Sequence, residues 1–527
     1  MSYHILKIFR KWSFFFFVTF ILSLILRFIY IDEPIVDIHA FRQTQTAISV
    51  EYMLQDGLSW DSIINYKTPV FGPPWTIPME FPFYQVSAYY IHKIMNVFGM
   101  DNLDFSLRIT SLVYFYLSLF LLYRFLSYLS LSAKTVNICC FLYMILPFSI
   151  FWSRTATIES CALFWCLGYL FCLIKFLNEK RLTYLFVGII AGVIGFLTKI
   201  TTAFPFCVFA GIYILHYFYQ NKNEDISSYF KSNFYRITGL LLLIFIPFSV
   251  FYVWLKYSDT QKDLPLIDFL TSKNLKSWNF GVFEDRVDIF VYREIAKNLW
   301  EQWPSLGFAL FFIIVLFKKF KSSFSKIEII LLFSCSVSFA LTLLTFTNLY
   351  YIHNYYYCAV FIFECIIVAI IFTHIDWKNI YTCWKGKLLL LAVLVSIFYT
   401  PVTLKNSLYV NFYLNNKYAN WHNSVDHQIA QTINDNTSPE ESVIIFSHGW
   451  EPVIPYYSHR KALMVLNLYD ISKYYQKISE DKEVYGFLVI SNNDDEYASN
   501  MNFFKKNYEI IFIKKVNEFE LYKLNKI

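Results

Sequence analysis

Long apolar segments recur along this chain, and they constrain its fold more than any other feature of the sequence. Crossing a bilayer as a helix takes about 20 residues, and most of these runs approach that length. With 57% hydrophobic and only 16% charged residues, the composition departs from that of soluble proteins. We therefore predict a polytopic α-helical membrane protein with about eleven transmembrane helices, over residues 12–31, 106–124, 135–152, 160–177, 182–198, 201–219, 237–256, 304–317, 327–346, 355–373 and 388–403.

The connections between these runs alternate in positive charge. If the N-terminus is cytoplasmic, every cytoplasmic segment carries at least two Lys or Arg residues, whereas the short outer loops hold only Arg154 and Lys199. This bias predicts a cytoplasmic N-terminus and an extracytoplasmic C-terminus. It also explains the net charge of +6, so no nucleic-acid partner is expected. The first run is long and no small-residue cleavage site follows it, which indicates a retained anchor.

Three polar segments are too long to be simple connectors. Residues 32–105 and 257–303 are expected to be outer loops of a membrane domain that covers residues 1–403. Residues 404–527 are expected to form a small soluble α/β domain. Its apolar strand candidates at 442–446, 462–466, 485–490 and 509–513 alternate with amphipathic stretches at about 421–434, 468–479 and 494–506.

Ionisable and aromatic residues gather where the predicted helices meet the outer surface. Placing such groups near the hydrocarbon edge is costly, so they usually have a partner or a function. Asp37 has no evident structural duty, and it lies five residues before Arg42. The candidates are Asp37, His39, Arg42 and Glu80 in the first loop, Arg154 and Glu159 in a short loop, Lys199 at a helix end, and His353 and Tyr355 in another short loop.

Structural interpretations compete with these functional ones. A long cationic side chain at a helix end often reaches toward lipid head groups, so Arg154 and Lys199 fit an anchor as well as a ligand. A tyrosine run at an interface, such as the one that begins at Tyr355, is more often an aromatic belt than a substrate platform. An isolated histidine such as His353 is more often a packed residue than a catalyst.

Several of these motifs, in this order, resemble bacterial members of the GT-C glycosyltransferase superfamily, in particular the protein O-mannosyltransferase-like group that includes the lipid A aminoarabinose transferase. Residues 37–47, DIHAFRQTQTA, resemble the loop pattern Asp-x-His-x-Trp-Arg-Gln-x-Asp-Thr-Ala, with Phe41 in place of the Trp and Gln45 in place of the later Asp. Residues 80–84, EFPFY, resemble Glu-Phe-Pro-Leu-Tyr. Counterparts also exist for residues 153–156, 353–357 and 454–460.

The resemblance implies an enzyme of the bacterial cytoplasmic (inner) membrane. It would move a sugar from a polyprenyl-phosphate-linked donor to an acceptor on the outer face, which could be a cell-envelope glycan, lipid A or a protein. The enzyme would also contact membrane lipids. An inverting transfer of this kind needs a carboxylate base and cations that stabilise the departing phosphate. We assign Asp37 as the base and Glu80 to a sugar hydroxyl or to the acceptor; the competing assignment makes Glu80 the base and pairs Asp37 with Arg42.

The remaining candidates are assigned to substrate binding. The phosphate ligands are Arg42, Arg154, Lys199 and His353, and the other substrate-binding residues are His39, Glu159 and Tyr355. The reaction requires no cofactor and no metal, although a divalent cation is compatible with the site. The sequence contains no phosphate-cradling glycine loop, in keeping with a donor that is carried by a lipid rather than by a nucleotide.

Two other functions stay open. A transporter or flippase of lipid-linked sugars would place charges deep within its helices, and here Glu364 is the clearest such charge. A polysaccharide polymerase or ligase would use the same chemistry with a larger donor, and the sequence separates it poorly from a monosaccharide transferase.

Overall fold

The computed structural model describes residues 14–220, 226–303, 323–375 and 417–527, together with positions 382, 384, 387 and 391. The chain divides into two compact units. Unit 1 comprises Met1–Ile31, Ser111–Trp254 and Lys276–Leu414, and unit 2 comprises Asp32–Thr110, Leu255–Leu275 and Asn415–Ile527. The boundary predicted between residues 403 and 404 lies outside the described residues.

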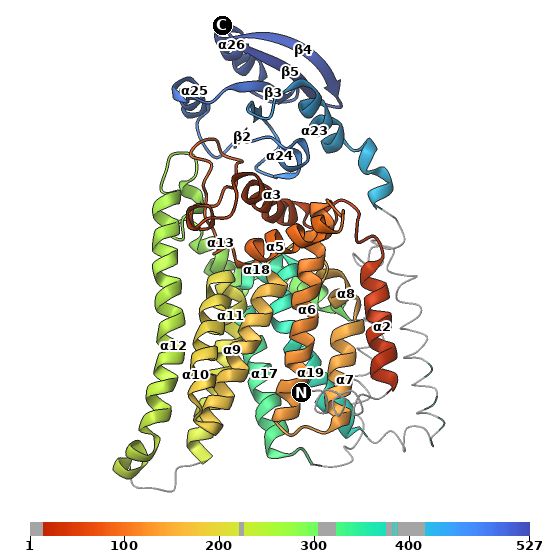
Figure 1. Ribbon diagram of the computed structural model, residues 1–527, viewed down its shortest axis with the longest axis vertical. Coiled ribbons are helices and arrows are strands. Elements are labelled where there is room, and N and C mark those ends of the chain that lie inside the picture. Colours follow the sequence, from red (N-terminus) through yellow and green to blue (C-terminus); the bar gives the residue numbers. More distant parts are fainter. Residues whose placement is uncertain are drawn as a thin grey trace. The chain divides into compact units, whose positions relative to one another are not determined.

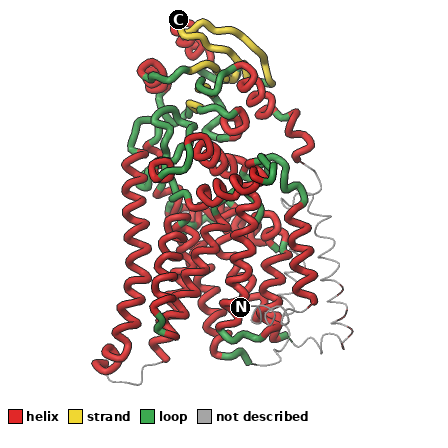
Figure 2. Tube along the Cα trace, in the orientation of Figure 1, coloured by secondary structure: helices red, strands yellow, loops and turns green. Residues whose placement is uncertain are grey.

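Unit 1 is built of helices (Figures 1 and 2). Its helices are α2 (Phe14–Phe28), α7 (Ala133–Ile145), α8 (Pro147–Trp152), α9 (Glu159–Glu179), α10 (Leu182–Thr198), α11 (Ile200–Gln220), α13 (Lys276–Phe280), α14 (Phe283–Val287), α15 (Ile289–Gln302), α17 (Lys326–Thr345), α18 (Thr347–Ile352), η2 (Asn354–Tyr357) and α19 (Cys358–His374). The unit boundaries fall within α6 (Leu103–Tyr128) and α12 (Ile226–Lys262).

Six helices in the described part of the chain are long and apolar enough to cross a membrane, and α2, α7 and α10 are shorter apolar helices. Within the described residues, helices cover nine of the eleven predicted runs. The run at 304–317 lies outside the described residues, as does almost all of the run at 388–403. The predicted fold class of a polytopic α-helical membrane protein is confirmed.

Small residues let two of these helices approach closely. On α10, a Cβ added at Gly192 would lie 2.8 Å from the Tyr169 ring on α9, and one added at Gly195 would lie 2.9 Å from Cys166 Sγ. Spacing small residues along one face is a common device for packing membrane helices. Helix α9 also packs against α11, and α17 packs against both α11 and α19.

Proline explains one departure from the predicted spans. The run expected at 135–152 is split into α7 and α8, and Pro147 is the first residue of α8. Proline lacks the N–H that would continue the preceding helix, but it fits a helix's first turn. A single apolar run in the sequence therefore corresponds to two helices.

Unit 2 contains the first predicted outer loop, and there helices α3 (Ala40–Asp56), α4 (Trp60–Ile64) and α5 (Phe83–Val97) form. Residues 65–82 separate α4 from α5. The Pro- and Trp-rich segment between them is irregular, with a short antiparallel bridge between Lys67 and Thr76. A 3-10 turn, η1 (Asp268–Leu270), comes from the second predicted loop.

The C-terminal part of unit 2 is an α/β fold with one five-stranded sheet, drawn in yellow in Figure 2. Its strands are β1 (Ser442–Ile445), β2 (Ala462–Met464), β3 (Tyr485–Ser491), β4 (Tyr508–Val516) and β5 (Phe519–Lys526), in the order β2-β1-β3-β5-β4. Strands β1, β2 and β3 are parallel, and β5 is antiparallel to β3 and β4. The helical elements are η3 (Lys417–Asn423), α23 (Val425–Asn436), α24 (Val453–Ser458), α25 (Ile471–Glu480) and α26 (Tyr497–Asn507).

The predicted small α/β domain is confirmed, and β5 is the strand that the sequence analysis missed. Strand β5 lies between β3 and β4, and its charged residues Glu520 and Lys523 interrupt the buried residues Phe519, Leu521 and Leu524. The first loop also contacts this sheet. Backbone hydrogen bonds join Ala462 N to Pro69 O at 2.9 Å and Met464 N to Val70 O at 3.0 Å. The first loop therefore pairs with the free edge of β2, the edge strand of the sheet.

Candidate active site

Asp37 lies in unit 2, in the loop just before α3, and its side chain is only 2% exposed. The Gln43 side-chain amide donates a hydrogen bond to Asp37 Oδ1, and Arg108 Nη2 donates to Oδ2 at 3.3 Å. Arg108 also donates to the carbonyl oxygens of Glu33 and of Pro34, the latter at 3.0 Å. The carboxylate is therefore held in one orientation by a guanidinium that also fixes the backbone of its own loop.

Glu80 forms the second carboxylate–guanidinium pair of unit 2. Arg42 Nη2 lies 2.5 Å from Glu80 Oε1, and Arg42 Nη1 donates to Gln45 Oε1 at 2.7 Å. Gln45 stands where the related loop pattern has an aspartate, so its amide supplies an acceptor without a second negative charge. The Tyr66 hydroxyl donates to the Glu80 carbonyl at 2.9 Å and accepts from Met79 N at 2.7 Å, which fixes the backbone.

These pairs differ from the pairing in the competing sequence assignment. There Asp37 was paired with Arg42, whereas in the structure Asp37 pairs with Arg108 and Arg42 pairs with Glu80. The two carboxylates also differ in access, because the Glu80 side chain is 32% exposed. Asp37 thus sits in a nearly dry environment, and Glu80 is open to solvent.

His39 occupies the N-terminal cap position of α3 with a left-handed backbone, φ 56°. Its carbonyl oxygen accepts from Arg42 N at 2.9 Å and from Gln43 N at 3.2 Å, so it starts the helix with its backbone rather than its ring. This conformation is uncommon for a residue with a side chain. It places His39 between Asp37 and the two residues of α3 that contact the carboxylates.

Lys199 and Glu159 form a buried ion pair in unit 1. The Lys199 ammonium donates to Glu159 Oε1, and the two side chains are 5% and 2% exposed. Lys199 has an extended backbone between α10 and α11, and Glu159 is the first residue of α9. The ammonium also lies 4.2 Å from the ring centre of Tyr356 and 4.8 Å from that of Tyr355, a cation–π arrangement.

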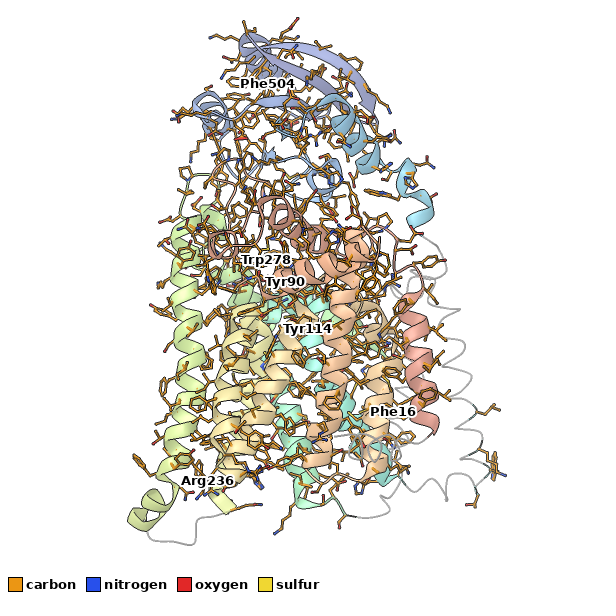
Figure 3. All side chains as sticks on the ribbon, in the orientation of Figure 1. Phe16, Tyr90, Tyr114, Arg236, Trp278 and Phe504 are labelled. Atoms are coloured by element: carbon orange, nitrogen blue, oxygen red, sulfur yellow. The ribbon has the colours of Figure 1, made fainter. Side chains whose placement is uncertain are left out.

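His353 and Tyr355 belong to an aromatic stack in the same unit. Their ring centres are 5.1 Å apart with 20° between the planes, and Tyr355 stacks on Tyr356 at 4.7 Å. Trp278 of α13, labelled in Figure 3, lies 5.8 Å from the His353 ring. This cluster forms an aromatic surface beside the Lys199 ammonium.

Arg154 is almost fully buried, at 1% exposure. Its guanidinium donates to the carbonyl oxygens of Ile29 and of Tyr30, the latter at 2.6 Å. These carbonyls follow the end of α2, where a cation is favoured by the helix dipole. The contacts therefore give Arg154 a structural duty at the C-terminal end of α2.

The candidates thus fall into two sets, each within one unit. Asp37, His39, Arg42 and Glu80 lie in unit 2, and Arg154, Glu159, Lys199, His353 and Tyr355 lie in unit 1. Among the described residues, no group of three or more His, Cys, Asp or Glu side chains is arranged to hold a metal ion.

Sequence reasoning missed Arg108, the partner of Asp37. Arg108 lies near the start of an apolar run, where a basic residue reads as a helix end, and 71 positions separate it from Asp37. The useful signal was Asp104 one turn earlier, which places a second charge on the same helix face. Asp104 accepts hydrogen bonds from the hydroxyls of Tyr456 at 2.6 Å and Tyr457 at 2.9 Å.

The motif at 454–460 therefore supports the first loop. The Tyr457 hydroxyl also accepts from Ile35 N at 2.8 Å, two residues before Asp37. The His459 imidazole pairs with Glu51 on α3, and this hydrogen bond with the carboxylate raises the pKa of His459. The tail thus braces both the loop that carries Asp37 and the helix that carries Arg42.

Comparisons with known proteins agree with this architecture. Residues 85–270 match the family described as dolichyl-phosphate-mannose-protein mannosyltransferase. No curated protein sequence matches the chain. The solved structure of ArnT from Cupriavidus metallidurans bound to undecaprenyl phosphate is similar with a TM-score of 0.60 and 11% identity, covering 96% of this chain and 97% of that one.

Two further structures show the same fold. The apo form of ArnT from Cupriavidus metallidurans has a TM-score of 0.54 at 10% identity, covering 96% of this chain and 97% of that one. The Archaeoglobus fulgidus oligosaccharyltransferase in complex with Zn and sulfate has a TM-score of 0.51 at 12% identity, covering 96% of this chain and 72% of that one.

The fold and the comparisons define the class of this protein as a multi-pass membrane protein with the GT-C fold. More particularly, it is similar to ArnT over nearly the whole length of both chains. The fold that the loop motifs predict is confirmed by this similarity.

Proposed function

We propose that this protein is a glycosyltransferase that moves a sugar from a polyprenyl-phosphate-linked donor to an acceptor on the outer face of the cytoplasmic membrane. The observation that carries the proposal is the pair of carboxylates in the first loop, Asp37 and Glu80, each oriented by its own guanidinium. The match to the mannosyltransferase family and the GT-C fold support the same class of reaction.

In this proposal Asp37 takes the proton from the acceptor hydroxyl. The hydrogen bonds from Gln43 and Arg108 fix the orientation in which this carboxylate meets a substrate hydroxyl. Fixing a base in advance avoids the cost of orienting it during the reaction. Because the Asp37 side chain is nearly dry, water competes little for the same oxygen.

Glu80 and Arg42 hold the substrates beside that base. Glu80 is one-third exposed and accepts hydrogen bonds from a sugar hydroxyl, and Arg42, which Glu80 and Gln45 hold in place, contacts an anionic phosphate. His39, at the start of α3, also binds substrate.

In unit 1, the Lys199 ammonium and the His353–Tyr355 stack bind the lipid phosphate and the ring of the sugar. Lys199 approaches Glu159 and two tyrosine rings, so a phosphate would add a second anion beside a cation that is already desolvated. Glu159 holds the Lys199 ammonium in place. Arg154 fixes the loop that precedes Glu159. Transfer with inversion follows from a single displacement by the acceptor hydroxyl.

Two charges within predicted helices have partners inside the protein. Arg27 donates to Ser153 Oγ at 2.6 Å and to the Met144 carbonyl at 2.8 Å, and Glu364 accepts from Trp303 Nε1 at 2.7 Å. Charges bound in this way serve helix packing, which favours a transferase over a flippase with a charged midplane site.

The experiment compares cell-envelope glycans, glycolipids and glycoproteins by mass spectrometry in cells that have the gene, lack it, or carry Asp37→Asn in its place. We expect one sugar residue to disappear from one acceptor in the deletion and Asp37→Asn strains and to return with the wild-type gene. Unchanged envelope sugars in the deletion strain would overturn the proposal.

A further inference from the structure

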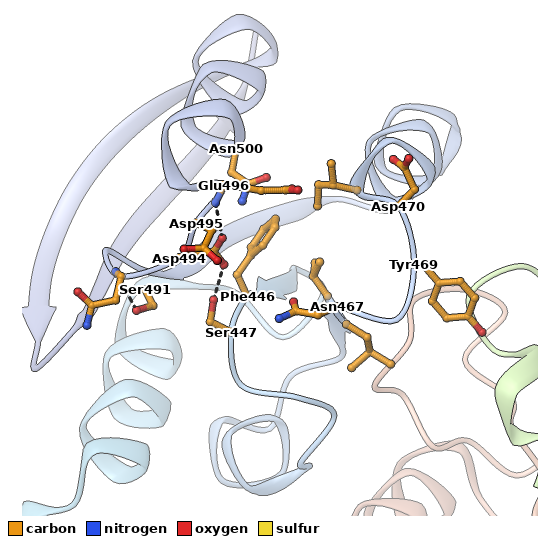
Figure 4. Close-up of a pocket in the computed structure, with 14 residues that line it drawn as sticks. Phe446, Ser447, Asn467, Tyr469, Asp470, Ser491, Asp494, Asp495, Glu496 and Asn500 are labelled. Atoms are coloured by element: carbon orange, nitrogen blue, oxygen red, sulfur yellow. Dashed lines mark hydrogen bonds between the residues drawn. The ribbon is translucent and has the colours of Figure 1, made fainter.

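A cavity of about 660 Å³ opens in the C-terminal α/β fold, at the carboxyl ends of its parallel strands (Figure 4). It is lined by Phe446 and Ser447 after β1, by residues 465–467 after β2, and by residues of the 491–496 loop after β3. Its volume falls within the range of about 300–1,000 Å³ that is typical of small-molecule sites.

The strand order puts this cavity where ligands usually bind in α/β sheets. The chain leaves β1 toward β2 on one side and leaves β3 toward β4 on the other, because the order is β2-β1-β3-β5-β4. Adjacent connections in opposite directions leave a crevice outside the carboxyl ends of the two strands. None of the residues assigned to sugar transfer lines it.

The walls carry negative charge and no positive charge. The described residues that line the cavity include four carboxylates and no Lys, Arg or His; the four are Asp470, Asp494, Asp495 and Glu496. Asp494 accepts from the Ser447 hydroxyl and, at 2.9 Å, from Glu496 N, so it ties the β3 loop to the β1 loop. An anionic ligand such as a phosphate would be repelled.

Asn500 supplies a second and independent feature. It lines the cavity and is only 1% exposed, and its Oδ1 accepts from the Tyr475 hydroxyl at 2.5 Å. Its side-chain nitrogen has no hydrogen-bond partner among the described residues of the chain. Because Asn500 lines the cavity, this amide can donate a hydrogen bond to a ligand there.

We infer that this cavity binds a carbohydrate through its hydroxyl groups. The carboxylates of the wall accept hydrogen bonds and the Asn500 amide donates, so the cavity suits a ligand that does both. A hydroxyl does both, whereas a metal ion or a protonated amine cannot accept and a phosphate is repelled. Phe446, Val465 and Ile471 also line the cavity and give it an apolar part for the C–H groups of a sugar ring. The inference does not depend on transfer activity.

The test is saturation-transfer NMR on the full-length protein in lipid nanodiscs, without sugar-based detergents. The probes are glucose, galactose, mannose and N-acetylglucosamine, with spermidine as a cationic probe that lacks hydroxyls. We expect at least one sugar to give a signal and the double variant Asp495→Asn/Glu496→Gln to bind it about tenfold more weakly. Both residues are exposed, so the substitutions spare the fold.

Asn500→Asp keeps an oxygen for Tyr475 and replaces the unpaired donor by an acceptor, so it should also weaken the sugar signal. Asp435→Asn, an exposed carboxylate on α23 away from the cavity, is the matched control and should leave the signal unchanged. Four outcomes would overturn the inference: no signal from any of the four sugars, a signal that survives the double variant, one that the control removes equally, or binding of spermidine alone. Since no donor or turnover is involved, failure here is distinct from failure of the proposed transfer.

Discussion

The substitution Asp37→Asn removes a proton acceptor while keeping the size and shape of the side chain. A positioned general base is typically worth about 10²–10⁴-fold in rate. This corresponds to about 3–5 kcal/mol in the activation free energy, at about 1.4 kcal/mol for each factor of ten. We therefore expect turnover to fall by at least a hundredfold.

The structure also gives the expected cost in stability. Arg108 loses its anionic partner but keeps the carbonyl oxygens of Glu33 and Pro34. Losing one hydrogen bond to a charged group costs about 1.5–3 kcal/mol. Asp104→Asn is the matched control, because it also removes a buried charge from unit 2, where the carboxylate accepts from two tyrosines. It should lower the midpoint of thermal unfolding by a similar amount and reduce turnover far less than Asp37→Asn does.

The assay measures single-turnover transfer from a polyprenyl-phosphate sugar by protein reconstituted in liposomes, with thermal unfolding measured on the same samples. Glu80→Gln is the comparison, because it should reduce acceptor affinity more than turnover if Glu80 forms hydrogen bonds to substrate. Near-normal turnover of Asp37→Asn alongside an inactive Glu80→Gln would refute our reasoning and make Glu80 the base.

Three further predictions concern donor binding, topology and pH. Arg42→Ala should raise the Kd for the lipid donor about tenfold, since a phosphate contact is lost, and unchanged binding would remove Arg42 from that role. In intact cells, an impermeant thiol reagent should label a cysteine at Asn436 and not one at Lys319, and the reverse pattern would invert the topology. The contact with Glu51 raises the pKa of His459 in the folded protein. The stabilisation of the fold by this contact is therefore complete below the unfolded-state pKa of about 6.5, and it is lost as the pH rises through the higher folded-state pKa. The thermal midpoint should fall over that interval in the wild type more than in His459→Gln, and parallel curves would contradict the linkage.

The helices could be predicted because a bilayer leaves the backbone few other choices. An apolar run must satisfy its own backbone hydrogen bonds, so runs such as 160–177 appear as helices almost regardless of their neighbours. The parallel strands were predictable for a similar reason, since β3 is buried along its whole length and reads as a continuous apolar run.

The pairing within the site could not be predicted in the same way. The contact of Asp37 with Arg108 depends on where the loop turns back onto α6, which no local pattern records. Strand β5 could not be predicted because charged residues interrupt its apolar pattern. It is recognisable as a strand only from its position between β3 and β4 in the sheet. The roles of the site residues stay predictions, because the motifs point to a class of chemistry and the geometry shows contacts rather than turnover.

The measurement that tests the central claim most directly is donor dependence. Purified protein in liposomes would receive labelled sugar as a polyprenyl-phosphate conjugate or as a nucleotide sugar, with a membrane extract from the deletion strain as the acceptor. We predict transfer from the lipid-linked sugar alone and its loss in Asp37→Asn. Direct transfer from the nucleotide sugar with no lipid carrier present would contradict the account.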